Sequence, residues 1–281
     1  MLSIAGSDSG GGAGIQADLK AFAASGVHGM TAITAITAQN TLGVTAVHPV
    51  PPEVIVAQVQ AVVEDIGVDA VKVGMLGDRA TIKAVVCALD ALADGTPVVL
   101  DPVMVAESGA VLLEPSARKA LIELVLPRAT VITPNVPEAR ALLAEAELGA
   151  KAERAETERA EAERAQLPAL VRALHALGPA VVVVTGGHRD QATDLFFDGA
   201  RLVEIPGERH PDGAAHGSGC THSAVLAARL ALGDDPLEAS RTAKEMAARA
   251  VRDGLEEIGA GPGPVDVLGV GDRAARLSTI R

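Results

Sequence analysis

The sequence has 281 residues, of which 48% are hydrophobic, and a formal net charge of −12 at pH 7, which predicts a globular chain with a substantial core and argues against a phosphate-backbone partner. It has no Trp or Tyr and three Phe, so it offers no aromatic platform for stacked bases. Because no run approaches the roughly 20 apolar residues that span a bilayer and no basic signal region precedes the first apolar residues, we expect a cytoplasmic protein without nucleic-acid or membrane partners.

Short β-branched runs alternate along the chain with longer amphipathic segments. The strand-like runs are 2–5, 30–37, 70–73, 98–101, 130–133 and 180–185. The helical segments between them include 15–25, 52–66, 79–93, 115–125 and 168–177. This alternation predicts βαβ units and an α/β fold with a mainly parallel sheet covered by helices. No internal repeat or clear linker interrupts it, so we expect a single domain over residues 1–281.

Two segments depart from the alternation. Residues 43–50 contain Val44, Thr45, Val47 and Val50 and predict a short strand outside the main sheet. Residues 151–166 are rich in Ala, Glu and Arg, with opposite charges three or four positions apart. This spacing is typical of a solvated surface helix, to which we assign no function.

Polar residues and glycines follow every strand-like run. They are Gly6-Ser7-Asp8, Gln39-Asn40, Gly74-Met75, Asp101, Asn135 with Glu138, and Gly186-Gly187-His188. Any one of these groups alone is ordinary turn chemistry. Because ligands bind beyond the carboxyl ends of strands in open α/β sheets, their recurrence predicts a site at that edge.

Missing motifs exclude several classes of site. The glycine-rich stretch at 6–14 lacks the GxGxxG spacing, and the chain contains neither GxxxxGK[ST] nor HExxH, which disfavours a dinucleotide site and excludes a P-loop and a zincin. Two distant cysteines form no disulfide framework or metal cluster. We expect Cys87 to be a core thiol, and His216 and His222 to be packing or surface residues rather than ligands.

The stretch HGSGCTHSAV begins at His216 and opens a helical pattern. Gly217 and Gly219 allow a tight turn, and the first N–H groups of the following helix have no internal partner, which predicts an anion site. At such a position the thiolate of Cys220 would be favoured relative to the free value of about 8.5, making Cys220 a candidate base or nucleophile. The alternative, a small residue that fits a helix start, stays open.

Several stretches together resemble one family. The GSGC sequence at 217–220 and NVPE at 135–138 resemble the GxGC and NxxE motifs of ribokinase-like kinases. Further matching stretches are AGSDSGGGAGIQADLK at 5–20, TAQNTLGV at 37–44, KVGML at 72–76, DPVM at 101–104, ITPNVPEA at 132–139 and GGH at 186–188. In this order, from residue 2 to about 265, the chain resembles the hydroxymethylpyrimidine/phosphomethylpyrimidine kinases of thiamine biosynthesis.

The resemblance implies a three-layer αβα ribokinase-like fold and a homodimer that uses MgATP twice, first on a hydroxymethylpyrimidine and then on its monophosphate. The implied pyrimidine pocket consists of Gly6, Ala13, Asp18, Gln39, Met75 and Val103. The implied catalytic anion site consists of Gly217, Ser218, Gly219 and Cys220. Asp101 and Glu138 would act on Mg²⁺ through its waters, and Asn135, Thr185 and Gly187 would contact phosphate or nucleotide. The loop 103–112 is a candidate lid.

Two departures qualify the resemblance. The family usually carries Lys where this chain has Thr185, and often Lys where it has Glu107. A pyridoxal kinase of the same fold, or a non-catalytic pyrimidine-binding protein, therefore remains an alternative. Related sugar kinases place Asp at the position of Cys220, where a base assists a hydroxyl acceptor. We expect a neutral thiol to avoid repulsion when the second acceptor is already an anion.

Overall fold

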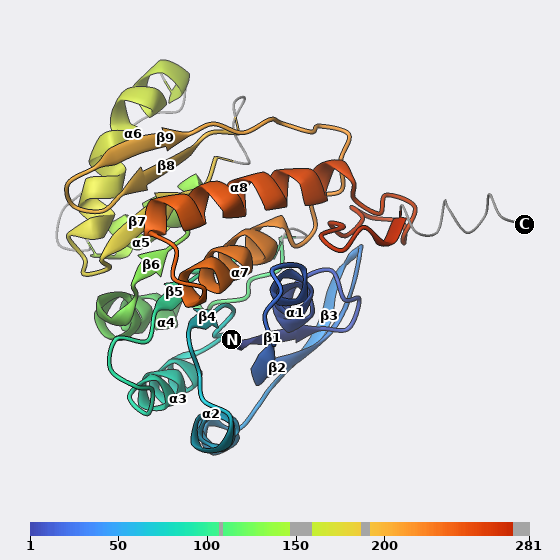
Figure 1. The fold of residues 1–281 in the computed structure, drawn as a ribbon, viewed down its shortest axis with the longest axis vertical. Helices are drawn as coiled ribbons and strands as arrows, with labels where there is room; N and C mark the ends of the chain where they lie inside the picture. The colour runs from blue at the N-terminus through green and yellow to red at the C-terminus, as the bar shows by residue number, and fades with distance from the viewer. Residues whose placement is uncertain (107–108, 147–158, 187–191, 272–281) are drawn as a thin grey trace, which may run out of the picture.

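The computed structural model describes residues 1–106, 109–146, 159–186 and 192–271. Its centre is a sheet of order β3-β2-β1-β4-β5-β6-β7-β8-β9 (Figure 1). The strands are β1 Leu2–Asp8, β2 Met30–Asn40, β3 Gly43–Pro49, β4 Val71–Val73, β5 Val98–Leu100, β6 Val131–Ile132, β7 Val181–Val184, β8 Asp194–Phe197 and β9 Leu202–Ile205. Pairing is parallel from β2 through β7 and antiparallel at both edges.

Helices cover both faces of the sheet. They are α1 Gly14–Ala24, α2 Pro52–Asp65, α3 Arg79–Leu89, α4 Pro115–Ala120, α5 Val136–Ala146, α6 Arg159–His175, α7 Ser218–Ala231 and α8 Pro236–Arg252. One apolar cluster joins the sheet to α2 through α6, and a second joins it to α1, α7 and α8. These layers confirm the predicted three-layer α/β fold with a mainly parallel sheet.

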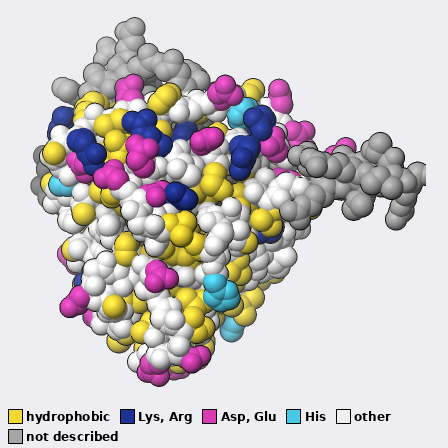
Figure 2. Space-filling view, in the orientation of Figure 1, with side chains coloured by type: hydrophobic (Ala, Val, Ile, Leu, Met, Phe, Trp, Pro, Cys, Tyr) yellow, Lys and Arg dark blue, Asp and Glu magenta, His cyan; other side chains and the backbone are white. Residues whose placement is uncertain are grey.

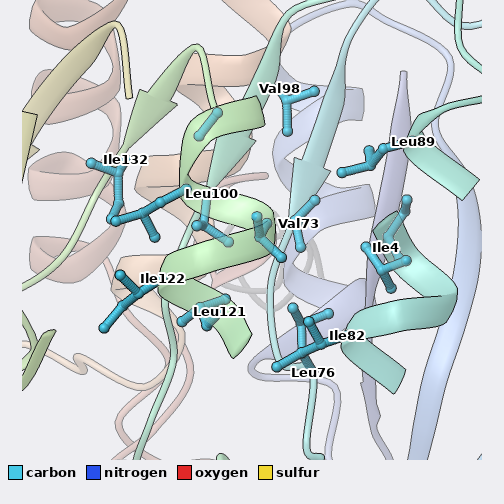
Figure 3. Packing of buried hydrophobic residues seen from close by; sticks show 14 of the residues in the cluster. Ile4, Val73, Leu76, Ile82, Leu89, Val98, Leu100, Leu121, Ile122 and Ile132 are labelled. Carbon is cyan, nitrogen blue, oxygen red and sulfur yellow. The ribbon is translucent and has the colours of Figure 1, made fainter. Parts of the chain in front are cut away.

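Alternation along the strands builds the two clusters, because successive side chains point to opposite faces of a sheet. Leu100 faces the α2–α6 layer, whereas its neighbour Val99 faces α1, α7 and α8. Figure 3 shows Leu100 and Val73 on the strands packing toward Ile82 of α3 and toward Leu121, which begins the π-helical turn Leu121–Val125 that follows α4. With so few aromatic residues, the core is filled by branched aliphatic side chains.

The surface over the α8 side carries intermingled acidic and basic side chains, as Figure 2 shows. Several of them are paired, including Arg241 with Glu238 at 3.3 Å and Arg252 with Asp253 at 2.7 Å. The net charge of −12 is therefore not gathered into one acidic patch on this face. Among the described residues, no helix is long and apolar enough to cross a membrane.

The structure differs from the sequence predictions at three places. Residues 43–50 do not form a strand outside the sheet, because β3 pairs with β2 as its antiparallel edge strand. The β8–β9 hairpin was not predicted. Cys87 is exposed and not a core thiol, because α3 buries the face that carries Ile82, Val85 and Leu89 and turns Cys87 away. Of the charged segment 151–166, residues 151–158 lie outside the described part, and α6 begins at Arg159.

Candidate active site

The carboxyl ends of the parallel strands meet the first turn of α7. Asp101 follows β5 directly, and its Oδ2 accepts a hydrogen bond from Ser223 Oγ of α7 at 3.1 Å. Asn135 and Thr185, which follow β6 and β7, form a parallel bridge farther along the same edge. The structure thus brings the predicted anion turn and Asp101 together. Gly187 lies outside the described residues.

The anion turn depends on the backbone of Gly217, which caps α7 with φ of +83°, in the left-handed region. A Cβ at this position would overlap the carbonyl oxygen of Gly12. Glycine is therefore required both for the conformation and for this close approach. The N–H of Ser218 donates to the carbonyl oxygen of Ala215 at 3.0 Å, so the groups that the turn leaves for an anion are the next N–H groups of α7, at Gly219 and Cys220.

Cys220 carries a protonated thiol. Burial raises its pKa to about 12, and the charges of Asp101 and Asp18 add to the rise, while Lys72 and a backbone hydrogen bond from Gly14 oppose it. The prediction that the helix start favours the thiolate is therefore wrong, because desolvation and two nearby carboxylates outweigh the helix dipole. The thiol is a neutral group at the anion turn.

Asn135 and Glu138 form a capping box at the start of α5. The N–H of Asn135 donates to Glu138 Oε2 at 2.9 Å, and the N–H of Glu138 donates to Asn135 Oδ1 at 2.8 Å. The NxxE motif thus has a structural role that the helix N-terminus alone explains. The box also holds the Glu138 carboxyl group at the sheet edge, where the negative charge of Asp101 raises its pKa.

Asp101 and Glu138 fit a hydrated magnesium ion. Burial, and then the charge of Asp101, raise the pKa of Glu138 to about 8, so the two carboxylates repel each other in the protein alone. Mg²⁺ usually takes one or two carboxylates, keeps several waters and binds substrate phosphates as well. The described residues include no cluster of three or more His, Cys, Asp or Glu that could hold a metal ion, and the role of Asp101 and Glu138 toward Mg²⁺ stays a prediction.

Lys72 is a site residue that the sequence analysis missed. It is fully buried on β4, and its Nζ lies 2.9 and 3.1 Å from the two carboxylate oxygens of Asp18 and 3.8 Å from Asp101 Oδ2. Burial is the largest single influence and lowers the pKa of Lys72, but the surrounding acidic groups, Asp18 foremost, together raise it more, so the pKa lies above its ordinary value. Ser3 Oγ donates to Asp18 Oδ2 at 2.6 Å. Asp18 is fully buried, and both of its carboxylate oxygens accept hydrogen bonds from Ser3 or Lys72.

The other predicted pocket residues lie along the same edge. Gly6 and Met75 are in contact, since a Cβ on Gly6 would lie 2.9 Å from Met75 Sδ. Gln39 is bound through its backbone to Ser9 Oγ of the glycine-rich loop, with its N–H donating at 2.8 Å and its carbonyl accepting at 2.7 Å. An open hollow of about 160 Å³ adjoins Gln39, and its lining also includes Ala106, His216 and Gly261.

Ala13 and Val103 are each bound to an aspartate at the end of a strand. Ala13 caps the start of α1, and its N–H donates to Asp8 Oδ2 at 2.8 Å. The N–H of Val103 donates to the carbonyl oxygen of Asp101 at 2.8 Å, so Val103 is tied to the predicted metal residue. In the described part of the chain, Val103 is not among the residues that line the hollow beside Gln39, and their shared pocket stays a prediction.

A second buried ion pair lies beside the predicted nucleotide residues. Asp194 Oδ1 accepts hydrogen bonds from the N–H of Gly186 at 2.8 Å and from Lys244 Nζ at 2.6 Å. His222 Nε2 lies 3.3 Å from Asp194 Oδ2. Burial raises the pKa of Asp194, but His222 and Lys244 together lower it below its ordinary value. Asp194 and Lys244 were not singled out from the sequence, and they fix the turn that follows Thr185.

Comparisons with known proteins identify the family of the chain. The Phosphomethylpyrimidine kinase family matches residues 8–266. A hydroxymethylpyrimidine/phosphomethylpyrimidine kinase of Rhizobium meliloti (strain 1021) is 51% identical over 268 residues, covering 94% of this chain and 95% of that protein. The corresponding protein of Bacillus subtilis (strain 168) is 42% identical over 273 residues, covering 94% and 93%.

Solved structures with the same fold come from two kinds of kinase. The phosphomethylpyrimidine kinase of Clostridium difficile 630 is 39% identical, has a TM-score of 0.71 and covers 87% of this chain and 95% of that one. The pyridoxal kinase of Staphylococcus aureus in complex with pyridoxal is 33% identical, has a TM-score of 0.81 and covers 97% and 94%. Since the family match spans most of the sequence and close relatives cover nearly all of it, the chain belongs to the phosphomethylpyrimidine kinase family.

Proposed function

We propose that this kinase uses MgATP to phosphorylate 4-amino-5-hydroxymethyl-2-methylpyrimidine and then phosphorylates the monophosphate to the diphosphate, in thiamine biosynthesis. The observation that carries the proposal is the meeting of the glycine turn of α7 with Asp101, since Ser223 of α7 binds this carboxylate at 3.1 Å. The names of relatives that are 42% to 51% identical support the substrate.

Phosphoryl transfer asks a protein chiefly for positioning and charge stabilisation. The N–H groups at Gly219 and Cys220 would bind the transferring phosphoryl group, in the turn that the hydrogen bond from Ser218 N–H to Ala215 O stabilises. Asp101 and Glu138 would hold Mg²⁺ through its waters, and the bound ion would neutralise part of the phosphate charge. The pKa of about 12 keeps the proton on Cys220 Sγ at neutral pH. The thiol therefore does not remove the acceptor proton, and a loose transition state needs little help from a base.

The second acceptor is a phosphate group and carries negative charge before transfer begins. A carboxylate at position 220 would repel it, whereas the neutral thiol does not. Gly6, Met75 and Gln39 would form part of the pyrimidine pocket. Asn135, Thr185 and Gly187 would contact the nucleotide. The loop 103–112 would close over the site; its described part is bridged at Val105 and Val111, and residues 107 and 108 lie outside the described residues.

A coupled MgATP assay with the hydroxymethylpyrimidine, its monophosphate and pyridoxal as acceptors, with products identified by mass, tests the proposal. Diphosphate formed from the pyrimidine is the expected result. Pyridoxal is included because a pyridoxal kinase superposes with a TM-score of 0.81, and turnover of pyridoxal alone would assign the chain to that activity instead. A chain that binds the pyrimidine without any turnover would be a binding protein, the third alternative.

We also propose that the chain works as a cytoplasmic homodimer. The β2–β3 edge exposes three large apolar side chains, Ile36, Leu42 and Val47, which are 53%, 66% and 45% exposed. A second copy of the chain would remove this apolar surface from water. Light scattering coupled to size-exclusion chromatography should give twice the monomer mass for the wild-type chain. Ile36→Glu should shift the measured mass toward that of the monomer. A monomeric wild-type chain at micromolar concentration would contradict the proposal.

A further inference from the structure

Asp8 organises the glycine-rich loop between β1 and α1. Its carboxylate accepts hydrogen bonds from the N–H groups of Gly10 at 2.8 Å, Gly12 at 3.0 Å and Ala13 at 2.8 Å. The side chain is only 2% exposed. One buried carboxylate therefore fixes the loop that carries Ala13 and that follows the strand of Gly6. Ala13 and Gly6 both belong to the predicted pyrimidine pocket.

His216 binds the same carboxylate from the other end of the chain. Its Nε2 lies 3.1 Å from Asp8 Oδ2, although the two residues are 208 positions apart in the sequence. Burial raises the pKa of Asp8, but the contacts with His216, Ala13 and Gly10 lower it below its ordinary value, so Asp8 is ionised and Nε2–H is the donor. This charge-assisted contact is stronger than a neutral hydrogen bond.

The contact joins the loop to the anion turn at close range. The ring of His216 lies on Gly12, where a Cβ would be 2.2 Å from ring atom Cδ2. The next residue, Gly217, lies against the carbonyl oxygen of Gly12. The backbone of His216 is held as well, because its N–H donates to Gly263 O at 3.3 Å and its carbonyl accepts from Val265 N–H at 3.1 Å.

We propose that Asp8 and His216 are positioning residues that couple the glycine-rich loop to the anion turn at Gly217–Cys220. The coupling keeps the acceptor oxygen and the transferring phosphoryl group at the distance and orientation that the reaction needs. The proposal rests on the proposed function. His216 acts through Gly12 and Gly217, and Asp8 acts through Gly12 and Ala13. A small displacement between the two segments would separate the reacting atoms without removing any group that binds either substrate.

The test compares three variants. His216→Leu removes the donor, His216→Gln restores an N–H near the place of Nε2, and Lys20→Met is the matched control. Lys20 Nζ donates to Gly11 O at 2.7 Å, so it also tethers the glycine-rich loop, but it does not reach the anion turn. We expect His216→Leu to lower kcat by about 10- to 100-fold, while His216→Gln recovers most of the loss and Lys20→Met changes kcat by less than about twofold.

Calorimetry supplies a readout that loss of stability alone would not move. In the wild-type chain, ADP should tighten binding of the hydroxymethylpyrimidine by at least about fivefold, because each ligand orders one of the two coupled segments. This gain should vanish in His216→Leu, and the loss is read as the ratio of the Kd values with and without ADP, so a change in the Kd of the pyrimidine alone at the hollow that His216 lines does not affect it. If His216→Leu does not fold, Gly12→Ala displaces the same ring by steric overlap and should show the same loss of coupling.

Three results would overturn the proposal: no gain in the wild-type chain, a full gain in the folded His216→Leu variant, or an equal kcat loss in Lys20→Met. Failure of the proposed function appears separately, as absence of wild-type turnover with the pyrimidine. In that case pyridoxal replaces the pyrimidine in the same calorimetric comparison, and the same three results decide.

Discussion

The buried Lys72–Asp18 pair allows a sharp test of how the site is held together. Lys72→Met keeps the aliphatic stem but removes an ammonium group that lies 2.9 and 3.1 Å from the oxygens of Asp18. Both side chains have a relative exposure of 0%. The substitution therefore leaves an ionised carboxylate in the core with only Ser3 as its hydrogen-bond donor, or forces Asp18 to take up a proton.

Removing one partner of a buried ion pair costs about 3–5 kcal/mol of the free energy of unfolding, whereas replacing both partners is often close to neutral. Lys72→Met should therefore lose about 3–5 kcal/mol, and Lys72→Met/Asp18→Asn should regain at least about half of that loss. Recovery should stay incomplete, because Asp101 Oδ2, 3.8 Å from the missing Nζ, remains charged. Lys20→Met, which breaks one bond to a carbonyl group, should cost about 1 kcal/mol.

Urea denaturation at pH 7, followed by far-UV circular dichroism, measures these differences. Thermal melts should agree, with a loss of roughly 10 °C for Lys72→Met in a chain of this size. Two outcomes would refute the reasoning. The first is a Lys72→Met variant within about 1 kcal/mol of the wild type, and the second is a double variant no more stable than the single one.

Three further predictions concern the anion turn and the carboxylates. Cys220→Asp should slow the second phosphorylation at least about tenfold more than the first, since about 1.4 kcal/mol of added repulsion suffices; equal losses in product analysis would contradict it. Gly217→Ala should cost about 1–3 kcal/mol in urea denaturation, because φ is +83° and a Cβ would overlap Gly12 O. Folding raises the pKa of Glu138 from 4.5 to about 8, so its contribution to stability is greatest below pH 4.5 and falls as the pH rises toward 8. The free energy of unfolding of Glu138→Gln should lack this fall, and Mg²⁺ should reduce the fall in the wild type. If the wild type and Glu138→Gln showed the same dependence of stability on pH, the raised pKa of Glu138 would be disproved.

The position of the site was predictable because parallel strands present their carboxyl ends at one edge of a sheet. Asp101, Asn135 and Glu138 each follow a strand-like run, and the GSGC turn opens a helix that covers this edge. The unpredicted β8–β9 hairpin also had a local signal. Asp198-Gly199 lies between two apolar runs, which is typical of a hairpin, and Asp198 Oδ1 accepts the N–H groups of Ala200 and Arg201.

Residues that act through distant partners were not predictable from such patterns. Lys72 stands alone in an apolar run, and its partner Asp18 is 54 positions away, so only the packed structure brings the charges together. His216 and Asp8 are 208 positions apart. The protonation of Cys220 had the same origin, because the sequence placed the thiol at a helix start but did not reveal the two carboxylates and the desolvation that outweigh it.

The charge balance of the site explains why transferred phosphate groups would need a cation from outside the chain. Lys72 and Lys244 are the two buried lysines near the strand ends in the described residues, and both are paired, Lys72 with Asp18 and Lys244 with Asp194 at 2.6 Å. A lysine engaged at that distance offers little positive potential to a second anion. Thr185 adds no charge, so in the proposed reaction the N–H groups at the start of α7, and Mg²⁺ held by Asp101 and Glu138, would attract the phosphate groups. A bound cation would also relieve the repulsion between the two carboxylates, which in the protein alone raises the pKa of Glu138 to about 8.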